Sequence, residues 1–194
     1  MNYNESRIKA VRNSLDEGGL SAIYITNLTN VRYLSGFNGS AGSCFISEKV
    51  AYFISDGRYG TQSKEQVHDM EIIISNKPHI ETLVSKGIIA GKQKIAFEAD
   101  ELSINALTQL KLIASECQWV ETTQLVEKIA MVKDKLEISS MRTAVQITAR
   151  NLNEVSRVRR ALSIAVIAPA FCFSVFRDGA AMGVAQFDLP VDSI

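Results

Sequence analysis

The sequence predicts a mixed α/β domain over about residues 1–125, followed by a long helix. Strand-forming segments alternate with helical segments, which favours a sheet with helices on its faces. Two consecutive strand-forming segments are separated only by the polar stretch Ser47-Glu48-Lys49, which indicates a hairpin. Strand signals stop after Val126. The hairpin makes the expected sheet mixed rather than purely parallel.

The first half of the expected domain begins with a helix over residues 5–17. Ile8, Val11 and Leu15 recur at helical spacing, and Gly18-Gly19 ends the pattern. The elements expected next are a strand at 20–26, a helical turn at 30–34, strands at 44–46 and 50–54, an exposed helix at 57–67 and a buried strand at 70–75.

The second half repeats the alternation of helix and strand. A helix over residues 80–86 is closed by Gly87, and a strand follows at 94–97. Ser103 is the expected N-cap of a helix that runs to about residue 115. A strand at 119–122 completes the domain.

A domain boundary is expected near residue 125. Beyond it, apolar residues recur at roughly helical intervals and no strand signal appears: Ile129, Leu136, Ile138, Met141, Ala144, Ile147 and Leu152. We therefore divide the chain into a domain at 1–125, a linker and helix at 126–155, and a divergent segment at 156–194.

Composition restricts the partners and the compartment that we expect. The chain has 21 Lys and Arg residues against 21 Asp and Glu residues, so no global field favours nucleic acid or an anionic membrane. Cys44, Cys117 and Cys172 are scattered without a C-x-x-C pair, which predicts reduced thiols. The N-terminus lacks the apolar run of a signal peptide. We therefore expect a cytoplasmic protein that does not bind nucleic acid.

One apolar segment, Ala161–Phe176, follows three arginines at 157, 159 and 160. As a helix it is shorter than the roughly 30 Å hydrocarbon core of a bilayer, and Pro169 interrupts it. We expect a buried or misfolding-prone segment here and no membrane partner, with a membrane anchor as the less favoured alternative.

Two motifs stand out in the first domain. Residues 30–42 read Asn-Val-Arg-Tyr-Leu-Ser-Gly-Phe-Asn-Gly-Ser-Ala-Gly, and Gly36, Gly39 and Gly42 permit a loop to turn where a Cβ would clash. The loop lacks the Gly-Lys-Ser/Thr ending of a phosphate-binding loop, so a structural loop is favoured. After the hairpin comes Asp56-Gly57-Arg58-Tyr59, in which Asp56 and Gly57 end a strand and Asp56 caps the next helix.

Histidine-based catalysis has little support in the sequence. A triad can be assembled on paper from Ser40 or Ser43 with His68 and Asp56, but the chain has no Gly-x-Ser-x-Gly elbow. We expect His68 and the other histidine, His79, to be surface residues.

These motifs resemble the N-terminal domain of Xaa-Pro aminopeptidases (aminopeptidase P), in the creatinase/prolidase family. The resemblance implies a three-layer, mixed-sheet domain. It continues through Ile129–Ile138, which is similar to the linker and first helix of the family's α+β "pita-bread" catalytic domain, and extends to about Val155. Family members are metallopeptidases, that is, hydrolases that remove the N-terminal residue before proline. The resemblance implies two divalent metal ions, with manganese expected, bound by two Asp, one His and two Glu.

Beyond Val155 the sequence departs from the family pattern. Pro169–Phe176 could supply the family's next strand, but Met182 falls where the catalytic histidine would lie. No His or Glu follows Glu154. We therefore expect a truncated, incomplete catalytic segment with no catalytic residue, no metal site and no cofactor in this chain. The chain alone is predicted to be inactive.

The resemblance also implies candidate site residues. In family members, N-domain residues of one subunit can border the active site of a neighbouring subunit. The candidates for substrate access or inter-subunit contact are Arg58, Tyr59, Arg32 and Tyr33. Arg58 could bind a substrate carboxylate, because a guanidinium forks onto carboxylates. A local salt bridge of Arg58 with Asp56 or Glu65 is the favoured alternative.

The expected role of the domain is oligomerisation and control of the access of proline-containing peptides to the active site. Expected partners are further copies of the chain or an intact family member. The alternative is a non-catalytic interaction module that pairs with an intact family member. A third hypothesis is a degraded gene, in which residues 156–194 lack a packed site and promote aggregation.

Overall fold

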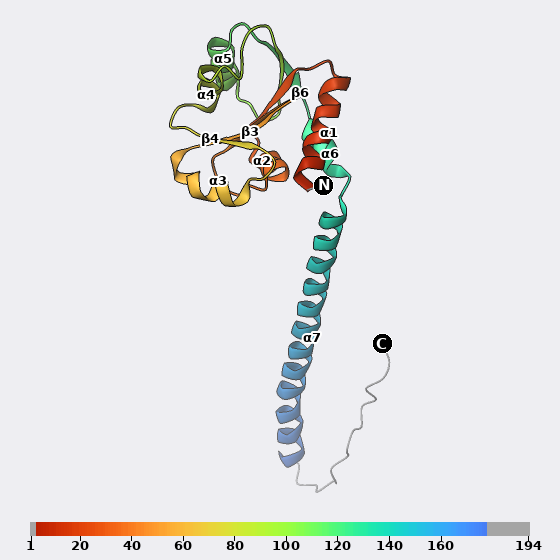
Figure 1. Cartoon of the computed structure of the whole chain (residues 1–194). Coiled ribbons are helices and arrows are strands. Elements are labelled where there is room, and N and C mark those ends of the chain that lie inside the picture. Colours follow the sequence, from red (N-terminus) through yellow and green to blue (C-terminus); the bar gives the residue numbers. More distant parts are fainter. Residues whose placement is uncertain (1–2, 178–194) are drawn as a thin grey trace. The chain divides into compact units, whose positions relative to one another are not determined.

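The first part of the chain contains a six-stranded mixed sheet. The computed structural model describes residues 3–177, with side chains described through Arg157. The strand order is β4-β3-β2-β1-β5-β6 (Figure 1). The strands are β1 (Ala22–Ile25), β2 (Ser43–Ser47), β3 (Ala51–Ser55), β4 (Glu71–Ile74), β5 (Lys94–Glu98) and β6 (Gln118–Thr122). β2 is antiparallel to β1 and β3, whereas the other neighbouring pairs are parallel. The predicted mixed sheet is confirmed.

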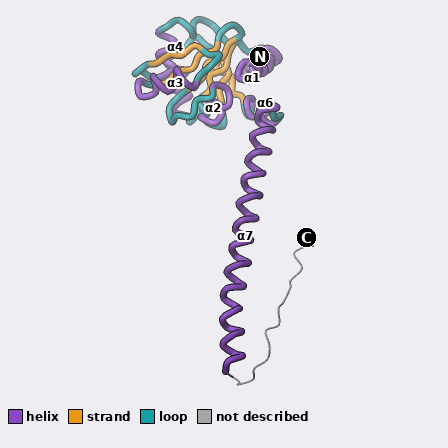
Figure 2. Tube along the Cα trace, turned by 60° about the horizontal axis from the view of Figure 1, so that its bottom comes forward, coloured by secondary structure: helices purple, strands orange, loops and turns teal. Residues whose placement is uncertain are grey.

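Helices cover both faces of this sheet (Figure 2). They are α1 (Tyr3–Glu17), α2 (Leu28–Ser35), the 3-10 turn η1 (Gly57–Tyr59), α3 (Gly60–Gln66), α4 (His79–Ser85), α5 (Ile104–Ile113) and α6 (Leu125–Met131). Alternate side chains of β1 enter two different cores. Ile23 and Ile25 pack with residues of α1, α2 and α6, while Ala22 and Tyr24 pack with residues of α4 and α5. The expected three-layer arrangement is therefore confirmed.

Local signals in the sequence correspond to local structure. Ser103 Oγ accepts a hydrogen bond of 3.2 Å from Ala106 N and so caps α5 as predicted. Gly87, which follows α4, has a φ of 70°. In the predicted hairpin, Ser47 N donates to Val50 O at 2.9 Å. Helical periodicity, caps and short turns depend on neighbours in sequence, so they are readable without the tertiary structure.

β4 differs from its prediction as a buried strand. It is the last strand of the sheet beyond β3, so one of its edges has no neighbouring strand in the described part of the chain. Ile73 is buried, but the side chain of Ile74 is 38% exposed. An apolar run such as Ile72-Ile73-Ile74 indicates a strand but does not reveal its place in the sheet.

The chain divides into two compact units, and the division falls between Lys133 and Asp134. We expected a boundary near residue 125. Helix α6 begins at that position and belongs to the first unit, because Val126 is 1% exposed and lies in the same core as α1 and α2. The cysteines whose side chains are described, Cys44 and Cys117, are free thiols.

The second unit contains one long helix, α7 (Lys135–Arg177). It begins with a capping box: Asp134 Oδ1 accepts from Glu137 N at 2.8 Å, and Glu137 Oε2 accepts from Asp134 N at 3.0 Å. The long helix was predicted. The strand suggested at Pro169–Phe176 was wrong, because α7 continues through Arg177. Met182 lies outside the described residues.

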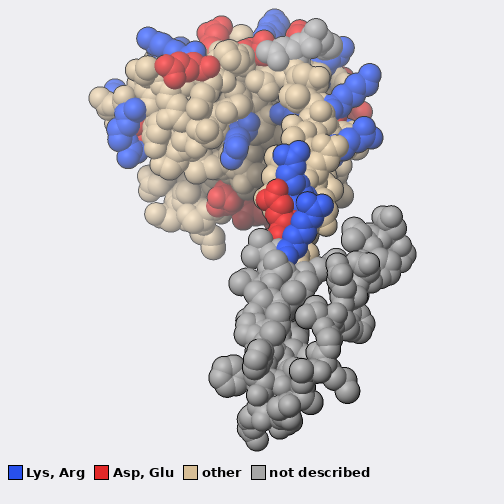
Figure 3. Space-filling model, turned by 90° about the horizontal axis from the view of Figure 1, so that it is seen from below, with Lys and Arg blue, Asp and Glu red and all other residues tan. Residues whose placement is uncertain are grey.

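Two further features concern the hydropathy of the helices and the distribution of surface charge. Among residues 3–157, whose side chains are described, no helix is both long and apolar enough to cross a membrane, and the segment Ala161–Phe176 lies outside that range. On the face of the domain in Figure 3, Lys and Arg side chains (blue) are interspersed with Asp and Glu side chains (red). This distribution agrees with the balanced charge of the chain.

Candidate functional site

The glycine-rich loop after α2 folds over a cluster of three aromatic rings, which we call the aromatic cluster: Phe37, Phe53 and Tyr59. The Phe37 ring lies 4.7 Å from that of Phe53, centroid to centroid, and 5.3 Å from that of Tyr59 in an edge-to-face arrangement. Phe37 and Phe53 are almost fully buried. The cluster connects the loop, strand β3 and the turn η1 into one packed unit.

Glycine occurs in this loop for two different structural reasons. Gly36 ends α2 with a φ of 80°, and its N–H donates to Arg32 O at 2.9 Å. Gly39 and Gly42 lie against the aromatic cluster. A Cβ at Gly39 would lie 2.8 Å from Tyr59 Cε1, and a Cβ at Gly42 would lie 3.0 Å from Phe53 Cε2. Close approach to the aromatic rings therefore requires glycine at Gly39, whereas at Gly42 a Cβ would make only a tight contact with Phe53.

Hydrogen bonds fix the loop to the turn η1 and to β3. Ser40 Oγ lies 2.7 Å from the Tyr59 hydroxyl, and Ser40 N donates to the same oxygen at 3.3 Å. These bonds from Ser40 lower the pKa of the Tyr59 phenol. Ser55 Oγ donates to Ala41 O at 2.6 Å. The position of Tyr59 is thus set by both its ring and its hydroxyl.

Arg58 projects from the same turn and is paired with Asp56. Arg58 Nε lies 3.0 Å from Asp56 Oδ1, and Nη2 lies 2.7 Å from Oδ2, which makes a forked ion pair. The hydrogen bond with Arg58 lowers the pKa of Asp56, and the same bond raises the pKa of Arg58. Asp56 Oδ1 also accepts from Arg58 N at 3.0 Å, the predicted cap. Of the two predicted salt-bridge partners of Arg58, the structure has Asp56.

The two other candidates, Arg32 and Tyr33, lie on α2, shortly before the glycine-rich loop. The guanidinium of Arg7 lies 4.2 Å above the centroid of the Tyr33 ring, and Arg7 Nη1 donates to Tyr33 O at 2.8 Å. Tyr33 is therefore part of the contact between α1 and α2. Arg32 is exposed. Arg58 and Tyr59 adjoin each other, whereas Tyr33 has a packing role of its own.

The position of His79 differs from the prediction. We expected a surface residue, but His79 is partly buried and its Nδ1 lies 2.8 Å from Ser43 Oγ. Burial lowers the pKa of the His79 imidazole, and the charge of Asp56 acts in the opposite direction. The residues are far apart in sequence, and only the preceding Pro78 gives a local sign that a helix begins at His79.

The triad of Ser40 or Ser43 with His68 and Asp56, which can be assembled from the sequence, does not form in the structure. The histidine beside Ser43 is His79, whereas His68 is exposed. Ser43 is 1% exposed and hydrogen-bonds the buried Tyr24 side chain as well. A buried hydroxyl that already has two partners is a structural group rather than an accessible nucleophile.

The described side chains do not form a metal-binding site. Among residues 3–157, whose side chains are described, those of His, Cys, Asp and Glu form no group of three or more that could bind a metal ion. The described residues therefore do not fit the centre of two Asp, one His and two Glu implied by the resemblance.

Comparison with known proteins identifies the family. The model of the creatinase/prolidase N-terminal domain matches residues 7–132, which include the glycine-rich loop, the aromatic cluster and α6. The chain belongs to the creatinase/prolidase family. The resemblance expected from the motifs is confirmed.

Several relatives of known structure or sequence share this creatinase/prolidase domain. The uncharacterized peptidase YqhT of Bacillus subtilis (strain 168) is 33% identical over 141 residues, which are 73% of this chain and 40% of YqhT. An Xaa-Pro dipeptidase from Bacillus anthracis has a TM-score of 0.64 and 32% identity, covering 70% of this chain and 38% of the dipeptidase. The chain thus spans about two-fifths of the length of these relatives.

The first unit also corresponds to a domain solved by itself. The N-terminal domain of the cytoplasmic peptidase PepQ from Mycobacterium tuberculosis H37Rv has a TM-score of 0.57 and 29% identity. The match covers 63% of this chain and 97% of that domain. The described α/β unit is therefore the creatinase/prolidase N-terminal domain.

Proposed function

We propose that this chain supplies the oligomerisation and substrate-access domain of an Xaa-Pro peptidase. The observation that carries this proposal is the family match over residues 7–132, together with relatives that are more than twice as long as the matched part. The substrates of the whole protein are proline-containing peptides, and it acts in the cytoplasm. Its two divalent metal ions, manganese in our proposal, bind outside residues 3–177.

Arg58 and Tyr59 are the proposed contact of this domain with the active site of a neighbouring subunit. The side chain of Arg58 is 73% exposed although it is paired with Asp56. The ion pair uses Nε and Nη2, so the hydrogens on Nη1 are available to a second acceptor. Tyr59 supports the guanidinium, which lies 5.5 Å from the centroid of its ring. A salt bridge to Asp56 and a contact with a peptide carboxylate are therefore compatible.

The residues of this chain are proposed to lack peptidase activity by themselves. The direct test incubates the purified chain with an Xaa-Pro dipeptide and manganese and measures the released amino acid. We expect no release above that of manganese alone. Metal-dependent release that a chelator abolishes would overturn this part of the proposal.

The oligomerisation role has its own test. Light scattering after size exclusion measures the mass of the chain alone and after mixing with a longer family member from the same cell. We expect either a mass above 21.3 kDa for the chain alone, or a complex in the mixture that is heavier than each protein measured by itself. Monomers in both samples would contradict the proposed role while leaving the family assignment intact.

A second candidate function is a non-catalytic module that pairs with an intact family member. The observation that favours it is a set of apolar side chains exposed along the second unit: Leu136, Ile138, Met141, Val145, Ile147, Leu152 and Val155. In the mixing experiment, a mixed complex with the longer protein supports this function. Self-association alone contradicts it.

A further inference from the structure

A buried carboxylate lies where the first strand of the sheet leads into α2. Glu98, at the end of β5, is 9% exposed. Its Oε2 accepts from Thr26 N at 2.7 Å and from Asn27 N at 2.8 Å. Its Oε1 accepts from Asn30 Nδ2 at 2.7 Å. Three short charge-assisted bonds compensate the burial of this carboxylate and set the orientation of the Asn30 side chain.

Asn30 connects this carboxylate to a second one on α6. Its Nδ2 also lies 2.7 Å from Glu127 Oε1, so its two hydrogens serve two carboxylates. Asn30 is 3% exposed. The reversed amide would turn its oxygen toward Glu98 and Glu127, which both repel it, so only one orientation is stable. The side chain of Asn30 thus links α2 to β5 and to α6 through hydrogen bonds.

Helix α6 has an unfavourable beginning. The residue before it, Gln124, has a φ of 55°, and no side-chain cap bond is formed there. A left-handed backbone costs about 1–2 kcal/mol for a residue with a Cβ. The helix has only seven residues, fewer than an isolated helix needs to be stable in water. Its stability therefore depends on contacts with the rest of the domain.

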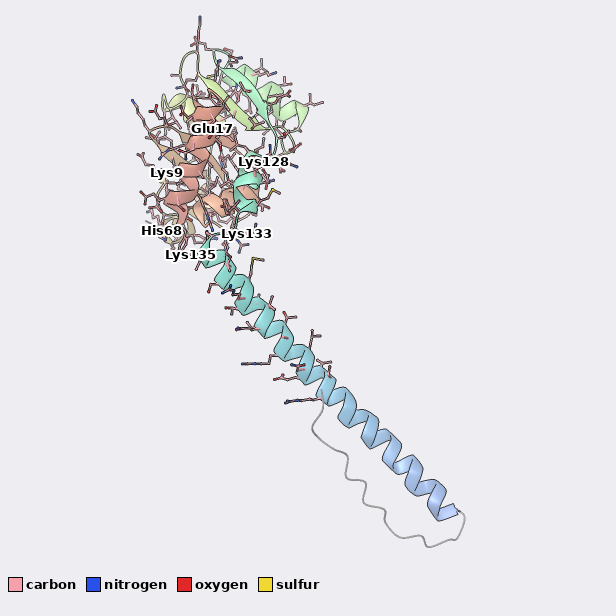
Figure 4. All side chains as sticks on the ribbon, turned by 90° about the vertical axis from the view of Figure 1, so that its right-hand side faces the viewer. Lys9, Glu17, His68, Lys128, Lys133 and Lys135 are labelled. Atoms are coloured by element: carbon pink, nitrogen blue, oxygen red, sulfur yellow. The ribbon has the colours of Figure 1, made fainter. Side chains whose placement is uncertain are left out.

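One side of α6 packs into the core through Val126, and another side adjoins an open groove. An open cavity of about 440 Å³ adjoins the helix, and its lining residues are Ser14, Thr122, Thr123, Leu125, Lys128 and Ile129. Half of these residues belong to α6, which runs beside α1, as the positions of Lys128, Lys9 and Glu17 in Figure 4 show. The side of α6 that faces this groove has no packed neighbour, so α6 is held to the domain by its core-facing side and by its hydrogen bonds.

We propose that α6 is a releasable strap and that Asn30, oriented by Glu98, is the latch that keeps it on the domain. Three observations support this: the strained start at Gln124, the adjoining cavity, and the bond from Asn30 to Glu127. Local opening of α6 adds its seven residues to the connection between the two units of the chain. The inference does not depend on the proposed function.

Hydrogen exchange read by mass spectrometry tests the latch. The full chain and its Asn30→Ala and Glu127→Ala variants are compared for exchange in the peptide that contains α6. A hydrogen bond to a charged group contributes about 1.5–3 kcal/mol to stability. We therefore expect amide exchange in α6 to be at least about tenfold faster in either variant than in the unmodified chain, after normalisation to exchange in β1 and β5. The double variant is expected to be no faster than Asn30→Ala, because both changes remove one interaction.

A matched control separates the latch from general destabilisation. Ser35→Ala alters another buried polar residue of α2, whose hydroxyl donates to Val31 O at 2.6 Å and accepts from Phe37 N at 3.1 Å, so both partners belong to α2 and the loop that follows it. It is expected to accelerate exchange throughout the domain without preference for α6. The proposal is overturned if Glu127→Ala leaves α6 unchanged relative to β5, or if Ser35→Ala accelerates α6 to the same degree.

Proteolysis gives a second readout that does not require a stable Asn30→Ala protein. Trypsin cleavage after Lys128 in α6 is compared with cleavage after Lys64 in α3, both being exposed lysines of short helices. Opening of α6 makes Lys128 the faster site in the unmodified chain, and Glu127→Ala increases the difference. Equal rates at the two lysines in both proteins contradict the strap.

Discussion

His79 Nδ1 lies 2.8 Å from Ser43 Oγ, so a hydrogen bond joins the first residue of α4 to the first residue of β2. Because burial keeps the pKa of His79 below its usual value, the folded chain favours a neutral imidazole. Ser43 also contacts Tyr24 in the centre of the sheet. Protonation of His79 therefore affects a bond within the core of the domain.

Stability is expected to fall in mild acid because of His79. An unfolded histidine has a pKa of about 6.5, and the folded value of His79 is lower. Below about pH 6.5 the unfolded chain therefore binds a proton that the folded chain does not. The contribution is complete above this pH and decreases as the pH falls toward the folded pKa. Urea midpoints at pH 7.5 and 5.5 measure the effect.

The two histidines provide a matched pair for this measurement. His79→Gln is expected to reduce the difference between the two midpoints, whereas His68→Gln, at an exposed position, leaves it unchanged. An equal pH dependence in the unmodified chain and in His79→Gln would show that another group is responsible.

Removal of the Arg58 side chain is expected to change the ionisation of Asp56 rather than the stability of the domain. In Arg58→Ala, the pKa of Asp56 rises toward its ordinary value, because the largest cause of its depression is the bond with Arg58. The thermal midpoint changes little, since exposed ion pairs contribute little to stability. Carboxyl chemical shifts followed by NMR during an acid titration report the Asp56 pKa. The control Lys64→Ala removes a cation of α3 and should leave that titration unchanged, and a shift of similar size in both variants would contradict the prediction.

Gly39→Ala is expected to destabilise the domain by about 1–3 kcal/mol, the usual cost of overpacking. The added Cβ would lie 2.8 Å from Tyr59 Cε1 and even closer to the Phe37 ring, so the aromatic cluster must move. Gly60→Ala is the control, because a Cβ there meets nothing within 4 Å and its φ is −58°. Denaturant unfolding measures both. Equal stabilities of the two variants would show that the loop does not need a close approach at Gly39.

Asn30→Asp is expected to be strongly destabilising at neutral pH and less so in acid. The new carboxylate faces Glu98 and Glu127, which were both accepting from the amide of Asn30. Loss of the donor costs about 1–3 kcal/mol, and like charges raise the folded pKa of the introduced Asp. A raised folded pKa means that stability is greatest below the unfolded value of about 3.9 and decreases as the pH rises through the folded value. Unfolding midpoints of Asn30→Asp and Asn30→Ala are measured at pH 7 and pH 5. The loss of stability in Asn30→Ala should vary less with pH than the loss in Asn30→Asp.

Much of the fold was predictable because its signals are local. The helix of Ile8, Val11 and Leu15, the cap at Ser103 and the hairpin at Ser47 each depend on residues a few positions apart. The ion pair of Arg58 with Asp56, two residues away, was among the predicted alternatives for the same reason. The motif from Asn30 to Gly42 also carried the family resemblance that the comparison confirmed.

The remaining features depend on strand order, which no local pattern specifies. Ser43 meets His79 across 36 positions, and Asn30 meets Glu98 and Glu127 across 68 and 97. The contact of Asn30 with Glu98 forms because β5 adds beside β1, and not beside β4, in the finished sheet. The sequence by itself determined the elements, their glycine and capping residues, and the family. Only the tertiary structure decided which buried polar groups meet, because a buried carboxylate or imidazole takes whichever partner the folded backbone brings within hydrogen-bonding distance.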